Sequence, residues 1–218
     1  MPSAGLAPSP KPRYVHLVFL GSEDWEPYVN NRVLGTIAII CAPALLIEGL
    51  LLRGQENNVV SGIAGMVFMA GWICSNIGMQ RMRATGNGTW GRAVLIIQLV
   101  GLVLAFLFGF VEATGLLDEN NGVFNVLDAA WPLSMLWMLV VGITVIVARR
   151  LSGWQRYVPL LCPFWLPIAL FLAAAFGEWA GLIGLAYAAV LWGLLGYIVL
   201  LNGDSRQQAT PASRSRVR

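Results

Sequence analysis

Long apolar runs separated by short polar segments make up most of the chain after residue 30. A helix needs about 20 apolar residues to cross the roughly 30 Å hydrocarbon core of a bilayer. Six runs reach this length, and they are continuous, without the alternation of apolar and polar residues typical of transmembrane β-strands. The pattern predicts an all-α protein with six transmembrane helices. We place these helices at about 33–52, 59–80, 93–117, 126–148, 157–176 and 179–201.

The two ends of the chain lack this pattern. Residues 1–30 begin with a proline-rich stretch and continue with aromatic and acidic residues, which predicts a tail followed by an interfacial segment. Residues 203–218 are polar and carry four arginines, which predicts a mobile basic tail. The six-helix transmembrane domain is therefore expected over residues 31–202.

The positions of the basic residues predict how the helices are oriented. Lysine and arginine in short loops stay on the cytoplasmic side of a membrane. If the amino terminus is cytoplasmic, all of the 14 basic residues except Arg53 fall on that side. The sequence thus predicts that both termini are cytoplasmic and that the protein lies in a plasma membrane or a bacterial inner membrane.

Composition agrees with a membrane protein. Hydrophobic residues make up 57% of the chain and charged residues 11%, whereas a soluble domain has roughly 25% charged residues. The net charge of +3 follows from the cytoplasmic arginines, so we expect membrane lipids, and no nucleic acid, as partners. A protein partner or a homo-oligomer is compatible with the sequence but not indicated by it.

Several membrane chemistries require residues that this chain lacks. The only histidine, His16, precedes the first helix, so haem cannot be held by two histidines between helices. The only lysine, Lys11, lies in the tail, which excludes a retinal Schiff base. Hydrolase, zincin and P-loop motifs are absent. We therefore predict no catalytic residue, no metal and no cofactor.

Acidic residues within the predicted helices are the main candidates for function, because a carboxylate facing lipid is costly. Glu48, Glu112 and Asp128 all lie toward the external ends of their helices, and Glu178 occupies the turn between the last two helices. One interpretation is a polar vestibule in which the first three bind a ligand or a proton. The alternative is that these acids are ordinary residues at helix ends.

The third predicted helix indicates where its acid points. Gln98 and Glu112 are connected by small residues at spacings of three and four, which places all of them on one helical face. Small residues allow helices to approach closely in a membrane. This face, which we expect to point into the bundle, consists of Gln98, Gly101, Ala105, Gly109 and Glu112.

Toward the cytoplasmic side, Asn76 and Gln98 lie at similar depths in the second and third helices. Polar side chains in membrane helices commonly form hydrogen bonds across helices. The matching depth predicts an interhelical polar pair between Asn76 and Gln98.

Prolines and tryptophans add two structural expectations. Proline removes a helical hydrogen bond, so the fifth helix, which contains Pro159, Pro163 and Pro167, is expected to be bent, with further candidate bends at Pro43 and Pro132.

Tryptophans deep in the helices need hydrogen-bond partners. They either pack in the core or line a cavity for a lipid-like ligand; they are Trp72, Trp137, Trp165 and Trp192.

Three functions remain open from the sequence. A small membrane protein that binds, senses or scaffolds is favoured, because no catalytic motif is present. A proton-coupled transporter or permease that uses Glu112 is the alternative. A lipid-modifying enzyme is the weakest candidate, since the acids are dispersed and no histidine lies in the helices.

Overall fold

The computed structural model describes residues 30–52, 57–118 and 120–207, and these residues form helices and turns without any strand. Six segments are long and apolar enough to cross a membrane, which confirms the expected all-α fold with six membrane-capable segments. The helices are α1 (Asn31–Cys41), α2 (Ala44–Leu52), α3 (Asn58–Arg81), α4 (Thr89–Thr114), α5 (Gly122–Ala148), η1 (Gly153–Arg156), α6 (Val158–Leu161), η2 (Cys162–Phe164), α7 (Trp165–Phe176) and α8 (Glu178–Gln207).

Some helix ends differ from the expected positions, for local reasons. Helix α4 ends at Thr114, because Gly115 adopts a left-handed conformation with φ of 61° that terminates the helix. Helix α5 already begins at Gly122, where the Asn121 side chain accepts a hydrogen bond from the Val123 N–H at 2.9 Å. Helix α8 continues to Gln207, beyond its expected end. Residues 1–29 and 208–218, which contain most of the expected tails, lie outside the described residues.

Two of the six spans are interrupted near prolines. The first span divides into α1 and α2 at residues 42–43, and the fifth divides into α6, the 3-10 turn η2 and α7. Proline lacks the N–H that would continue the helical hydrogen bonds, which explains the breaks beside Pro43 and Pro163. Helix α5, in contrast, remains continuous across Pro132.

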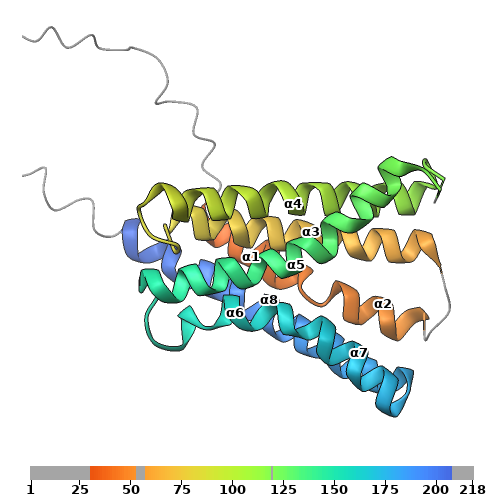
Figure 1. The fold of residues 1–218 in the computed structure, drawn as a ribbon. Helices are drawn as coiled ribbons and strands as arrows, with labels where there is room; N and C mark the ends of the chain where they lie inside the picture. Colours follow the sequence, from red (N-terminus) through yellow and green to blue (C-terminus); the bar gives the residue numbers. More distant parts are fainter. Residues whose placement is uncertain (1–29, 53–56, 119, 208–218) are drawn as a thin grey trace, which may run out of the picture.

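The helices pack around one another in a bundle. Helix α3 packs against α4 and against the α1–α2 pair, and α4 packs against α5. On the other side, α8 packs against α1, α2 and α7, while α5 contacts α6 and η2. Figure 1 shows that α7 and α8 diverge from α4 and α5 toward one end of the bundle.

Small residues allow α3 and α4 to approach closely. A Cβ atom added to Gly62 would lie 2.5 Å from the Gly109 carbonyl oxygen, so only glycine fits at this crossing. Ala105, on the same face of α4, is 4% exposed. The small-residue face of α4 therefore points into the bundle as expected, with Gly109 against α3 and Gly101 against α5.

An aromatic cluster fills the centre between α3 and α8. The rings of Trp72 and Trp192 have centroids 5.0 Å apart and lie nearly perpendicular, at 80°. Phe68 contacts both rings, with its centroid 5.3 Å from that of Trp192. These side chains are fully buried, so the middle of the bundle is a packed core.

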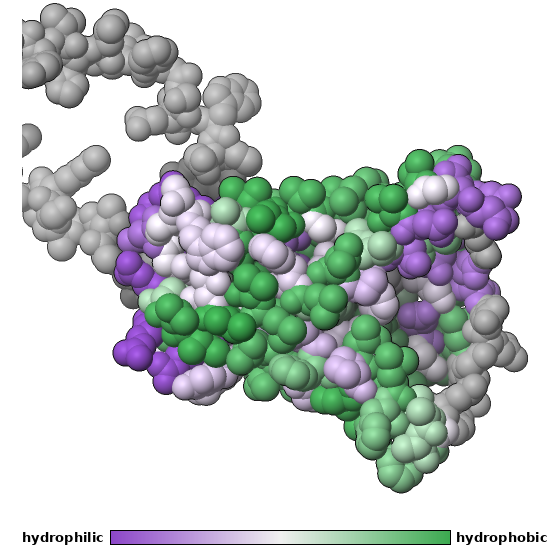
Figure 2. All heavy atoms as spheres, in the orientation of Figure 1, coloured by the Kyte–Doolittle hydropathy of each residue, from purple (hydrophilic) through white to green (hydrophobic). Residues whose placement is uncertain are grey.

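The two ends of the bundle are polar, and a broad apolar band lies between them (Figure 2). We call one end the arginine end, because the arginines whose side chains are described lie at the helix ends there: Arg32, Arg81, Arg83, Arg92, Arg149, Arg150 and Arg156. We call the opposite end the carboxylate end, and its described acids are Glu48, Glu112, Asp118 and Asp128.

Candidate functional site

A polar seam joins α4 and α5 within the apolar band. The Trp137 indole N–H donates a hydrogen bond to the Val94 carbonyl at 2.9 Å. The Gln98 amide Nε2 donates to the Ser134 carbonyl at 3.2 Å. Both bonds run from one helix to the backbone of the other, so they fix the register of α4 against α5.

A groove of about 570 Å³ runs along this seam between the two helices. Its polar residues are Gln98 and Ser134, which are 1% and 3% exposed. The remainder of its surface is almost entirely apolar and includes side chains that face outward from the bundle. These apolar lining residues are Ile97, Val100, Leu104, Val126, Leu133 and Leu136.

Two polar atoms of the groove residues have no hydrogen-bond partner. These are the Gln98 Oε1 atom and the Ser134 hydroxyl oxygen, and both are buried. Gly101 makes room for the hydroxyl, since a Cβ atom there would lie 2.5 Å from Ser134 Oγ. A buried polar group without a partner costs roughly 1–3 kcal/mol. The α4–α5 contact thus contains an acceptor and a hydroxyl whose hydrogen-bonding capacity is unused.

The comparisons with known proteins identify no relative. No family model matches the chain, and neither a curated protein nor a solved structure matches it.

The structure places the three predicted acids at the same end of the bundle. Glu48 on α2 and Glu112 on α4 are half-buried, whereas Asp128 on α5 is exposed. Glu112 experiences electrostatic repulsion from Glu48 first and from Asp128 second. The acids therefore act on one another across three helices, but their predicted role as a ligand or proton site stays a prediction.

The structure gives Asn76 and Gln98 partners other than each other. Asn76 Oδ1 accepts a 2.8 Å hydrogen bond from Gln80 Nε2, one turn later on the same helix, and Gln80 also donates to the Leu95 carbonyl on α4. Gln98 instead bonds to Ser134 on α5. The described hydrogen bonds thus do not join Asn76 to Gln98 directly, and the complementary atoms Asn76 Nδ2 and Gln98 Oε1 have no partner.

The four deep tryptophans have different environments. Trp137 and Trp165 donate hydrogen bonds, the latter to the Met135 sulfur at 3.4 Å. The indole nitrogens of Trp72 and Trp192 have no partner in the aromatic cluster. Of the four, Trp137 alone lines the α4–α5 groove.

Neither cysteines nor acids form a metal centre in the described part of the chain. No group of three His, Cys, Asp or Glu side chains there could hold a metal ion. Cys41, Cys74 and Cys162 are free thiols.

Sequence reasoning missed Ser134 and Gln80. Ser134 is a polar residue in an apolar stretch, which is a usable signal for burial, whereas Gln80 directly precedes Arg81 at the helix end and carries no such signal. Their partners depend on which helices become neighbours, and nothing in the linear pattern specifies that α4 lies against both α3 and α5.

Proposed function

We propose that this multi-pass membrane protein binds a lipid-like ligand in the groove between α4 and α5. The observation that carries the proposal is an apolar groove lined by two buried polar residues, Gln98 and Ser134, each of which has an unpaired side-chain oxygen. Ligand sites are typically apolar clefts of about 300–1,000 Å³ with a few polar groups that fix orientation. The groove has this composition and size.

The unpaired atoms suggest the chemistry of the ligand. Gln98 Oε1 only accepts hydrogen bonds, whereas a serine hydroxyl can donate and accept. A ligand hydroxyl can donate to the first and accept from the second. Both oxygens are covered in this structure, so binding requires the Ser134 side chain to turn toward the groove. A ligand with an apolar chain or ring system and one hydroxyl would match the apolar lining of the groove and form hydrogen bonds with Gln98 and Ser134.

The orientation of the protein is part of this proposal. The arginines at one end of the bundle support a cytoplasmic location for that end and for both termini, in a plasma membrane or a bacterial inner membrane. The groove lies between the two ends and faces the bilayer. A ligand dissolved in the membrane could then enter sideways, without passing through water.

Ser134→Ala tests the proposed site, because it removes the hydroxyl and little volume. The full chain is purified in mild detergent, and retained small molecules are quantified by native mass spectrometry and lipid analysis. One hydrogen bond contributes about 0.5–1.5 kcal/mol, so retention of the ligand should fall by roughly twofold to tenfold.

Ser75→Ala is the matched control. Ser75 is also buried with an unpaired hydroxyl, but it lies on α3 and does not line the groove. Its substitution should leave ligand retention unchanged. The proposal fails if no small molecule is retained by the unsubstituted protein, or if both serine variants lose it equally.

A proton-coupled permease is the second candidate. It is favoured by the electrostatic interaction of Glu112 with Glu48 and Asp128 at the carboxylate end. Membrane-embedded carboxylates often belong to proton or ion pathways. Proton-driven uptake by vesicles containing the purified protein distinguishes this function from binding alone.

A further inference from the structure

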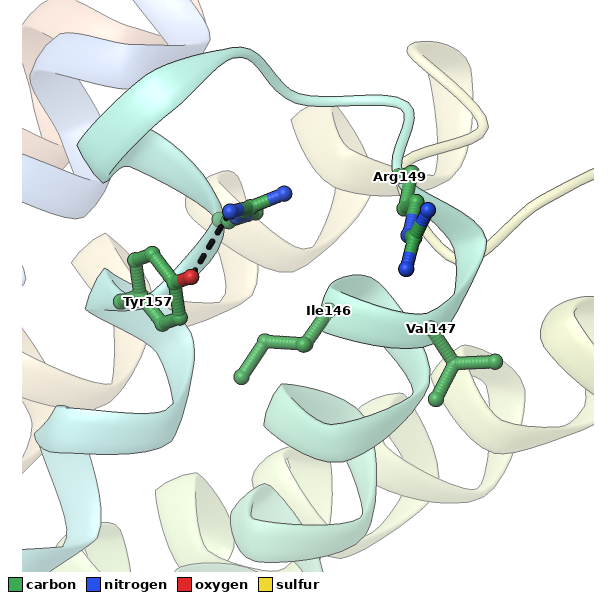
Figure 3. A pocket seen from close by; sticks show the side chains of 5 residues that line it. Ile146, Val147, Arg149 and Tyr157 are labelled. Carbon is green, nitrogen blue, oxygen red and sulfur yellow. Dashed lines mark hydrogen bonds between the residues drawn. The ribbon is translucent and has the colours of Figure 1, made fainter.

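A second pocket lies at the arginine end, where α5 ends and the chain turns through η1 into α6. Its volume is about 500 Å³. Figure 3 shows that Arg149 comes from the end of α5 and Tyr157 from the segment opposite it, with Ile146 pointing into the space between them and Val147 on the Arg149 side, pointing outward. Arg156 completes the lining. The pocket thus combines two guanidinium groups with an apolar side.

Tyr157 holds the Arg156 side chain in place. The Arg156 Nη2 atom donates a 2.7 Å hydrogen bond to the Tyr157 hydroxyl, and the guanidinium carbon lies 4.8 Å from the centroid of the same ring. The Arg156 Nε atom is buried and has no hydrogen-bond partner. Because Nε is covered, an oxyanion would be bound by the remaining Nη donors of this positioned guanidinium.

Arg149 supplies the second positive charge. It follows the last residue of α5 in a left-handed conformation, with φ of 51°, and its side chain is exposed. The described residues include no carboxylate that forms an ion pair with Arg149 or with Arg156. Within the described part of the chain, the positive charge of the pocket is therefore not neutralised by an ion pair.

The apolar side of the pocket points to a lipid. Ile146 and Val147 belong to the last turn of α5, toward the apolar band, and Val147 is 74% exposed. An anionic group held by the arginines would have its attached chain directed along these side chains. Free phosphate would use only the polar half of this surface.

We propose that this pocket binds the phosphate group of an anionic phospholipid, with Arg149 and Arg156 holding the headgroup and Ile146 and Val147 contacting an acyl chain. The site is separate from the α4–α5 groove and takes a different chemical class of ligand. Basic residues near a membrane each contribute about 1 kcal/mol to the binding of anionic lipid. Two arginines, one of them held in place by Tyr157, would therefore select an anionic lipid over a zwitterionic one.

The test is a titration of the delipidated full chain in detergent with phosphatidylglycerol, followed by native mass spectrometry. Phosphatidylcholine is titrated in parallel. We expect Arg149→Gln and Arg156→Gln each to weaken phosphatidylglycerol binding roughly fivefold, with no effect on the weaker binding of phosphatidylcholine. Ser134→Ala should leave phosphatidylglycerol binding unchanged, which separates this site from the proposed groove.

Arg150→Gln is the matched control, since Arg150 is exposed, adjacent to Arg149 and absent from the pocket lining. It removes the same charge and should not change the affinity. An equal loss for Arg150→Gln would mean diffuse attraction to the surface and would overturn the proposal. Displacement of the bound lipid by inorganic phosphate would overturn the assignment to a lipid.

Arg156→Lys keeps the test decisive if Arg156→Gln does not fold. Lysine retains the charge but lacks the planar fork of donors that binds phosphate at two points. We expect weaker phosphatidylglycerol binding with an unchanged melting temperature. Unchanged affinity for Arg156→Lys would contradict a fixed headgroup contact.

Discussion

Glu112 is a half-buried acid with two other carboxyl groups in its surroundings. It is half-buried on α4, and the described residues provide no arginine or lysine that pairs with it. Two further carboxyl groups, those of Glu48 and Asp128, repel its charge. Such an acid is either a tolerated residue at the edge of the bundle or a group that exchanges protons.

Glu112→Gln distinguishes these two roles, because glutamine has nearly the same shape but does not titrate. If the protein is a permease, proton-driven uptake into vesicles should fall to the level of empty vesicles, while the melting temperature is retained. Asp118→Asn, at an exposed position at the same end, is the control and should leave uptake unchanged. Equal uptake by the Glu112→Gln and unsubstituted proteins would rule out this role.

At the scale of elements, small residues decide how α4 meets its neighbours. Ala105 lies on the same face as Gly109, which contacts the backbone of α3. The spacing of these residues was sufficient to predict that this face is buried. It could not predict that Gly109 faces α3 while Gly101 faces α5, since both crossings depend on how the whole bundle assembles.

Ala105→Leu should destabilise the protein through overpacking. The added carbon atoms must fit where Ala105 is 4% exposed, and overpacking of a filled core costs about 1–3 kcal/mol. Thermal unfolding in detergent measures the change. Val103→Leu is the control, because Val103 is on the same helix but 44% exposed. An unchanged melting temperature for Ala105→Leu would contradict the close packing of this face.

The breaks in the spans were only partly predictable. Prolines in the fifth span predicted a bend, and the structure has the 3-10 turn η2 there. Pro132, with the same chemistry, leaves α5 continuous. Neighbouring groups in a membrane bundle can compensate the lost backbone bond at one position and not at another, so a proline in the sequence does not by itself predict an interruption.

At the scale of the whole molecule, the distribution of charge predicts orientation. The described arginines lie at the end of the bundle opposite Glu48, Glu112, Asp118 and Asp128. Basic residues are retained on the cytoplasmic side during insertion. This distribution was visible in the sequence, because it requires only the order of the spans. The groove and the arginine pocket were not visible in the sequence, since each combines residues from separate helices.

Accessibility labelling should therefore assign the loops to two sides of the membrane. In a background without the native cysteines, single cysteines at 57–58, 118–125 and 177 should react from outside the cell. Cysteines in either tail should react only after the membrane is permeabilised. Labelling of the two tails from opposite sides would contradict the six-span arrangement.

The aromatic cluster between α3 and α8 gives the protein an optical reporter of its own assembly. The indoles of Trp72 and Trp192 lie 5.0 Å apart at an angle of 80°, so their electronic transitions couple in a chiral arrangement. Such coupling produces a near-ultraviolet circular dichroism band that depends on the distance between the two helices. Separation of α3 from α8 would remove the contribution of this pair to the band while the helices and the Trp131–Trp165 contact persist, so the docking of these two spans can be followed without any label.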